Sequence, residues 1–380
     1  MSRDFRPIHG LLAVVAVSGM VTGLSSGFAR LGIFESAAAI ADRHAAFVLC
    51  GFFGTLISLE RAVASGTAAA LWIPGLAAAA SLLLWLDPLA AGLVFVIAGA
   101  GLASLCLKAA LSLRSLFSIV LTVGALLWPL GTLLWLVQGT TMEAGYVWLG
   151  FLILTITAER IELARLRKLS SRSAAALAGI LLLFCIALLG GEPLARSGPS
   201  WLLSVSLAGL AIWLLGNDIA LITLQGRALA RYSAVALLCG YGWLLVAALG
   251  LVLAPPSIDP EGHDLYLHAI GLGFVLSMVF AHAPIILPAV TGLRVSYSPA
   301  LYLPLALLQG ATALRVGSDL SSNADLRPQS AWLTLACLVL YALLLARTLR
   351  RRTTTAVLVQ APDVLHPDPR SDRQKDLSQW

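Results

Sequence analysis

The sequence predicts an all-α integral membrane protein with about twelve transmembrane helices, arranged as three four-helix arcs around a pseudo-three-fold axis. Three observations support this prediction. Hydrophobic residues make up 59% of the 380-residue chain and charged residues only 12%, about half the charged share of a typical soluble domain. Apolar windows of the roughly 20 residues that a spanning helix needs recur along the chain. A short motif also recurs on every fourth window.

The apolar windows cover almost the whole chain. They lie near residues 8–33, 43–64, 68–86, 89–112, 115–138, 145–166, 173–190, 201–223, 231–253, 265–292, 298–316 and 331–350. The first window begins like a signal peptide, but its apolar run continues to Ile33 and is too long for a cleaved segment. We therefore interpret it as the first spanning helix. Residues 1–350 form one membrane domain, and the polar residues 351–380 are expected to be a disordered cytoplasmic tail.

The distribution of lysine and arginine between the loops predicts the orientation. These residues gather at the N-terminus and after the even-numbered windows, while the opposite loops are acidic or neutral. Arg43, Arg196 and Arg327 are the exceptions. Both termini are therefore expected to be cytoplasmic, in a bacterial-type inner (plasma) membrane. The formal charge of +6 comes from this bias, and no clustered basic motif indicates nucleic acid as a partner.

The cysteines predict neither a disulfide framework nor a zinc site, because no CxxC pair occurs. They all lie inside apolar windows, where a free cysteine behaves as a small hydrophobic side chain. The five are Cys50, Cys106, Cys185, Cys239 and Cys337.

A Gly-Phe pair recurs on windows two, six and ten, and a polar residue able to bind a metal follows each Phe by eight positions. The stretches are GFFGTLISLERA, GFLILTITAERI and GFVLSMVFAHAP, and the polar residues are Glu60, Glu159 and His282. Successive pairs lie 99 and 123 residues apart, which leaves room for four helices each time. The repeat predicts three units, approximately 1–112, 113–223 and 224–350.

Histidines stand near the start of windows two and ten. The sequences are RHAAFVLCGFFGT and YLHAIGLGFVLSM, in which His44 and His268 precede the Gly-Phe pair. With three arcs of four helices, the chain resembles the haem–copper oxidase catalytic subunit. The patterns HAxxxxxGF and HAxxxGF also resemble the NnrS family, twelve-helix haem-associated membrane proteins linked to nitric oxide metabolism. The resemblance implies that helices two, six and ten line the interior and that His44 and His268 hold a haem b.

These two histidines form the outer candidate site. Neutral imidazole is the usual ligand of haem iron. The alternative is that each histidine lies at a helix start and bonds to headgroups, water or a loop. His44 precedes its Phe by eight residues and His268 by six, a difference of about 200° around an α-helix. The repeat must therefore have slipped or bulged.

The resemblance does not extend to the binuclear centre of an oxidase or nitric oxide reductase, which needs several histidines around a high-spin haem. Windows six and seven contain no histidine. We therefore do not expect a terminal oxidase, and nothing in the sequence identifies enzymatic turnover. The six histidines are His9, His44, His263 in a predicted outer loop, His268, His282 and His366 in the tail.

Glu60, Glu159 and His282 form the inner candidate site, with His9 as an additional member. Carboxylates and imidazole suit iron, copper or zinc, and acids and histidines in a row also suit a proton relay. The alternative for the two acids is an interfacial ion pair with the following arginine, Arg61 or Arg160.

Two further features lie near the inner site. His282 precedes Pro284 and Pro288, whose missing amides leave carbonyl groups free to take partners. Asp218 is an acid within the apolar eighth window. It could join the inner site, bind a cation or contact another helix.

Two functions of different classes follow. The first is a haem-binding membrane protein in nitric oxide or metal-related stress metabolism, with haem b at the outer site and copper or iron at the inner site. The second is a proton-coupled transporter of a small ion, metal or metabolite. Internal repeats in transporters are usually two-fold, so three units favour the first. Both place the protein in the lipid bilayer, with haem, a small gas or a metal as ligand.

Overall fold

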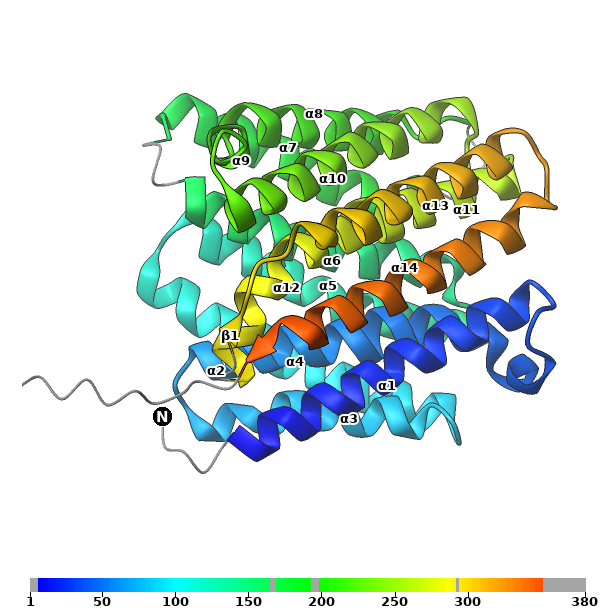
Figure 1. The fold of residues 1–380 in the computed structure, drawn as a ribbon, viewed down its shortest axis with the longest axis horizontal. Helices are drawn as coiled ribbons and strands as arrows, with labels where there is room; N and C mark the ends of the chain where they lie inside the picture. The colour runs from blue at the N-terminus through cyan, green and yellow to red at the C-terminus, as the bar shows by residue number, and fades with distance from the viewer. Residues whose placement is uncertain (1–5, 165–168, 193–197, 292–293, 351–380) are drawn as a thin grey trace, which may run out of the picture.

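Long helices run side by side along the longest axis of the molecule (Figure 1). The computed structural model describes residues 6–164, 169–192, 198–291 and 294–350. The long α-helices of the first half are α1 (Arg6–Arg30), α2 (Thr55–Ala64), α3 (Trp72–Leu83), α4 (Pro88–Leu113), α5 (Leu116–Gln138) and α6 (Thr141–Ala164). Those of the second half are α7 (Ser171–Leu189), α8 (Trp201–Asn217), α10 (Ala228–Leu253), α11 (Pro260–His268), α12 (Leu276–Thr291), α13 (Tyr302–Leu320) and α14 (Leu326–Thr348).

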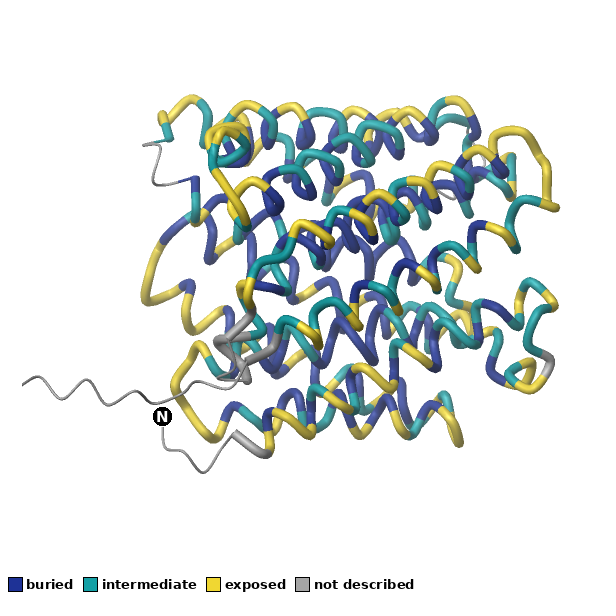
Figure 2. Tube along the Cα trace, in the orientation of Figure 1, coloured by how far each residue is buried: buried dark blue, intermediate teal, exposed yellow. Residues whose placement is uncertain are grey.

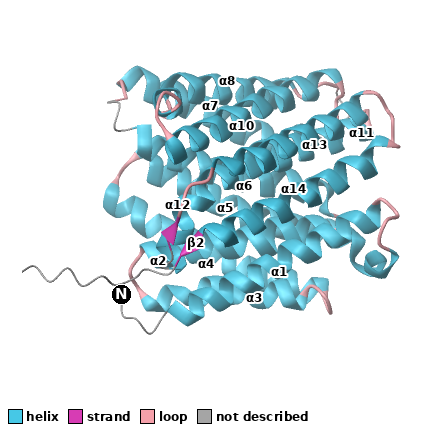
Figure 3. Ribbon diagram, in the orientation of Figure 1, coloured by secondary structure: helices cyan, strands magenta, loops and turns pink. Residues whose placement is uncertain are grey.

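Shorter elements join these helices. They are the 3₁₀ turns η2 (Glu35–Arg43), η4 (Ala68–Leu71) and η8 (Pro299–Leu301), and the four-residue helix α9 (Ala220–Thr223). Two strands of two residues, β1 (Arg294–Val295) and β2 (Leu349–Arg350), pair in antiparallel register, as Figure 3 shows. The chain is otherwise helical in the described part, because a helix satisfies its own backbone hydrogen bonds where lipid offers none.

Nine helices within the described residues are long and apolar enough to cross a membrane, and α3 and α8 belong to two shorter apolar helices. The first of these spans, Ile8–Arg30, lies near the N-terminus. The prediction of a helical, multi-pass membrane protein is confirmed. The arrangement of twelve spans in three arcs stays a prediction, and the predicted tail, residues 351–380, lies outside the described residues.

Two stretches of π-helix interrupt the helices that carry His44 and His268. They are η3 (Ala46–Gly54), which continues into α2, and η7 (Ala269–Val275), which joins α11 to α12. A π-helix bonds i to i+5 and turns less per residue than an α-helix. The difference of 200° between the two histidines was calculated for α-helices, so it does not apply to these stretches. Both η3 and η7 are bulged.

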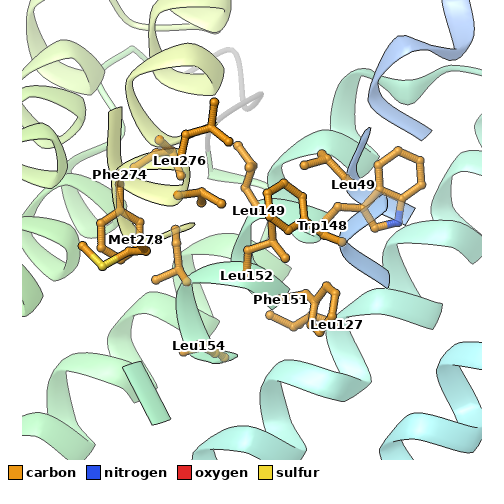
Figure 4. Close-up of a cluster of buried hydrophobic side chains, with 14 of the residues drawn as sticks. Leu49, Leu127, Trp148, Leu149, Phe151, Leu152, Leu154, Phe274, Leu276 and Met278 are labelled. Atoms are coloured by element: carbon orange, nitrogen blue, oxygen red, sulfur yellow. The ribbon is translucent and has the colours of Figure 1, made fainter. Parts of the chain in front are cut away.

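Helices two, six and ten in chain order meet in one buried apolar cluster. Figure 4 shows Leu49 of η3, Phe151 and Leu152 of α6, and Phe274 and Met278 of the η7–α12 segment within it. The middle helix, α6, is buried on nearly all sides, as the dark colour at the centre of Figure 2 illustrates.

The glycine of each repeated Gly-Phe pair provides space for a side chain from a neighbouring helix. A Cβ atom at any of the three positions would collide with that side chain. The motif therefore has a packing role whatever its polar residue does. The neighbours are Ser81 for Gly51, Leu188 for Gly150 and Trp243 for Gly273.

The predicted eighth window is broken at Asp218. This residue is extended (φ −68°, ψ 154°) and ends α8. Its carboxylate accepts a hydrogen bond from the main-chain N–H of Ala220 at 2.7 Å, which stabilises the start of the following turn because that N–H has no partner within its own helix. The acid thus lies at a helix break and not inside a continuous span.

Candidate functional site

His44 directly follows η2, two residues before η3 begins, and faces α1. Its Nδ1 is 2.6 Å from the main-chain oxygen of Gly23. A carbonyl oxygen only accepts, so Nδ1 carries the proton and Nε2 carries the lone pair. Gly27 of α1 gives the ring its space, since a Cβ there would lie 2.8 Å from Nδ1.

His268 is the last residue of α11 and is held in the same way. Its Nδ1 donates to the main-chain oxygen of Asp264 at 2.8 Å and lies 3.3 Å from the Asp264 carboxylate. Helix α11 begins about two turns before His268. There the Asp259 side chain accepts from Glu261 N and Pro260 occupies the first turn, a common helix start. Nε2 of His268 again carries the lone pair.

The two histidines lie within electrostatic range of each other. Neither Nε2 atom has a hydrogen-bond partner among the residues that the structure describes. The His268 side chain lies at the end of the helix bundle, and a quarter of its surface is exposed. Metal-binding histidines usually have this arrangement, in which one ring nitrogen donates to a carbonyl or carboxylate and the other is free to bind. Each of the two residues predicted for the outer site therefore presents an Nε2 atom that no described residue bonds.

A network of charges surrounds the outer site, and the sequence reasoning missed it. Asp264 pairs with Arg315, and Arg315 lies 3.6 Å from Asp319 one turn further along α13. Arg327 donates to Asp319 at 3.0 Å and lies 3.9 Å from Asp264. The signal for this network in the sequence was Arg315 with Asp319 four residues later, at the end of an apolar window. The network also explains Arg327 as an exception to the charge bias, because carboxylates neutralise it.

His263 belongs to α11, which corrects its predicted place in an outer loop. Its Nδ1 lies 3.1 Å from the hydroxyl of Tyr146 on α6. Tyr146 stacks on Tyr266 with ring centroids 4.8 Å apart. The Tyr266 hydroxyl is buried without a hydrogen-bond partner in the described part of the chain. These rings join α6 to α11 beside the two histidines.

Glu60 and Glu159 share one arginine at the inner end of their helices. Arg61 donates to Glu60 and lies 3.5 Å from Glu159 on α6. Side-chain exposure is 18% for Arg61, 31% for Glu60 and 23% for Glu159. The structure thus brings the two acids together, but a guanidinium lies between them. The expected pairing of Glu159 with Arg160 is not the one observed.

His282 lies in a second inner cluster with Arg160 and Asp218. Nδ1 of His282 donates to Met278 O at 2.6 Å, so its Nε2 accepts from the Arg160 guanidinium. Nε of Arg160 is 4.0 Å from Asp218 Oδ2, and Tyr241 OH donates to the same carboxylate at 2.9 Å. Arg160 is 4% exposed and Asp218 1%. The lone pair of His282 is therefore already engaged.

The prolines after His282 leave carbonyl groups free, as predicted, and other residues use them. Pro284 cannot donate to Phe280 O, and Tyr341 OH donates to that oxygen at 2.9 Å instead. His282 is therefore not the partner of the Phe280 carbonyl, because its Nδ1 bonds Met278 O instead.

His9 is 3% exposed on α1. Among the described residues, no hydrogen bond or ion pair joins it to Glu60, Glu159 or His282. The same part of the chain contains no group of three or more His, Cys, Asp or Glu side chains placed to hold a metal ion. The inner metal ion stays a prediction, and what the described contacts form is two ion-paired clusters.

The fold and these sites define a class, a multi-pass helical membrane protein whose polar residues gather in clusters near both ends of its interior helices. The chain belongs to the family described as "Domain of unknown function (DUF8744)", which matches residues 9–350. No curated protein and no solved structure matches the chain.

Proposed function

We propose that this protein binds haem b between His44 and His268 and serves nitric oxide or metal-related stress metabolism, as its resemblance to the NnrS family implies. It is not a terminal oxidase, since its histidines are too few for a binuclear centre. The observation that carries the proposal is the pair of imidazoles with their Nδ1 atoms bonded to main-chain oxygens and their Nε2 atoms without partners.

The residues present fit a haem. Two neutral imidazoles would serve as the protein ligands of a haem iron. The Asp264 carboxylate lies 3.3 Å from His268 Nδ1, and a carboxylate in this position commonly orients a ligating histidine. Arg30, within electrostatic range of His44, would offset the carboxylates of the porphyrin. A haem ligated in this way accepts and donates single electrons at its iron.

The proposed arrangement is twelve spans in three four-helix arcs, with both termini at the cytoplasmic face of a bacterial-type inner membrane. The shared cluster of η3, α6 and the η7–α12 segment supports it (Figure 4), because interior helices two, six and ten are what three arcs require. The matching π-helices at the start of helices two and ten add support, since such bulges are frequent at functional sites.

The full-length protein, purified with haem supplied during expression, is expected to be coloured. Its reduced spectrum should show the sharp bands of a six-coordinate low-spin haem b at about one haem per chain. Extraction and pyridine haemochrome measurement would give the stoichiometry. A colourless protein under the same conditions would overturn the proposal.

Gly27→Ala is expected to weaken haem binding at least about tenfold, because changes in the shell around a ligating histidine cost 10- to 100-fold in affinity. The added Cβ would lie 2.8 Å from Nδ1 and 2.9 Å from Cε1 of His44, so the ring must leave its bond to Gly23. Haem titration monitors the effect. The control is Gly10→Ala on the same helix, where a Cβ meets nothing within 4 Å. Equal affinities of the two variants would contradict the expected role of Gly27.

A proton-coupled transporter of a small ion, metal or metabolite is the second candidate. It is favoured by the buried charges of Arg160 and Asp218, since ionisable groups inside membrane proteins often mark ion or proton pathways. The spectrum of the purified protein decides between the two, because a transporter of this type has no need of haem.

A further inference from the structure

A cavity lined by two arginines and two tyrosines lies at the end of the bundle where α10 begins. Its volume is about 480 Å³, and its lining includes Arg227, Arg231, Tyr297 and Tyr302. Ligand pockets in proteins commonly measure about 300–1,000 Å³. None of the four residues belongs to the outer site or to the inner clusters.

The charge of this cavity is uncompensated. Arg227 and Arg231 are four residues apart at the start of α10, and like charges at this spacing repel each other. Both are exposed. Among the described residues, neither guanidinium forms an ion pair with a carboxylate. A bound anion would relieve the repulsion.

Main-chain groups add to this positive character. Helix α10 begins at Ala228, and its N-cap residue Arg227 provides no side-chain hydrogen bond to the first turn. The N–H groups of that turn therefore have no acceptor within the helix, and they favour phosphate. Tyr302 is held by an edge contact with the buried ring of Tyr232, at 5.3 Å between centroids, which holds its ring in place at the cavity.

We propose that this cavity binds a phosphate-bearing anion, supplied either by the headgroup of an anionic phospholipid or by a small soluble phosphate compound. Guanidinium groups match phosphate oxygens in a two-pronged geometry, and basic pockets between spanning helices commonly hold anionic headgroups. The proposal is independent of haem, because no residue is shared with the outer site.

The test compares the full-length protein with Arg227→Gln/Arg231→Gln. Native mass spectrometry measures retention of phosphatidylglycerol against phosphatidylcholine, and thermal unfolding in detergent is followed with inorganic phosphate or with chloride at equal ionic strength. The double variant is expected to bind the anion about 30-fold more weakly, equal to about 2 kcal/mol. The matched control is Arg172→Gln/Arg347→Gln, which removes two exposed arginines elsewhere.

Selective retention of phosphatidylglycerol, lost only in the Arg227/Arg231 variant, would assign the site to a lipid headgroup. Stabilisation by phosphate but not chloride, lost in the same variant, would assign it to a soluble phosphate compound. If the variant and its control bind both probes as the unmodified protein does, the proposal is wrong.

Discussion

Replacing His44 or His268 by alanine is expected to abolish the six-coordinate low-spin haem spectrum. Each residue offers one imidazole Nε2, and Nδ1 of each ring is bonded to a main-chain oxygen at 2.6 or 2.8 Å. Removing either ring leaves one axial position without a protein ligand. Spectra of the reduced and oxidised variants, at matched protein concentration, measure the loss. Added imidazole should restore six-coordination where the haem is retained, because it can occupy the vacated position.

His282→Gln is the matched control for these variants. It removes a histidine whose Nε2 already accepts from Arg160, so the low-spin spectrum should be unchanged. Circular dichroism and elution volume would establish that each variant is folded. The assignment of the ligands is wrong if His44→Ala and His268→Ala both keep the spectrum, or if the control loses it to the same extent.

Arg160→Met is expected to destabilise the folded protein by about 3 kcal/mol or more. Arg160 is almost fully buried and interacts with both His282 and Asp218. Its removal takes away the guanidinium that lies 4.0 Å from Asp218, whose buried carboxylate also accepts from Ala220 N–H and Tyr241 OH. Breaking a buried pair from one side costs about 3–5 kcal/mol. Thermal or denaturant unfolding of the purified protein in one detergent measures the change.

The double variant Arg160→Met/Asp218→Asn completes the comparison. It removes both charges, so it should lose less stability than the sum of the two single variants. Arg172→Met removes an exposed arginine and should change stability by less than about 0.5 kcal/mol. Additive losses in the double variant would show that Arg160 and Asp218 do not interact.

The inner site illustrates why spacing along a helix was insufficient. Glu60, Glu159 and His282 stand at equal distances from Gly-Phe, which predicts one level in the bundle. In the structure, however, these three side chains do not form one site. Arg61 lies between the two acids, and Arg160 binds His282. The two arginines therefore decided the contacts of these residues, Arg61 by joining both acids and Arg160 by binding His282. The sequence analysis had weighed each arginine only as a partner for the acid before it.

The outer site was more accessible to sequence reasoning. His44 and His268 stand near the starts of helices two and ten, so sequence reasoning could propose them as a pair, and that pairing stays a prediction. The hydrogen bonds of these histidines could not be predicted from the sequence, because Gly23 lies on another helix and the η3 and η7 bulges change the rotation along the chain. The ion pairs of Asp264 with Arg315 and Arg327 were equally hidden, since they join three separate helices.

The sequence by itself determined that the chain is a helical membrane protein and roughly where its helices lie. This was possible because a membrane requires apolar side chains and internally bonded backbone over a fixed length, and both requirements are local. The tertiary structure alone decided which polar groups meet. A contact such as Arg160 with Asp218 depends on the rotation and offset of packed helices, and these follow from side-chain packing between segments that the sequence does not place next to each other.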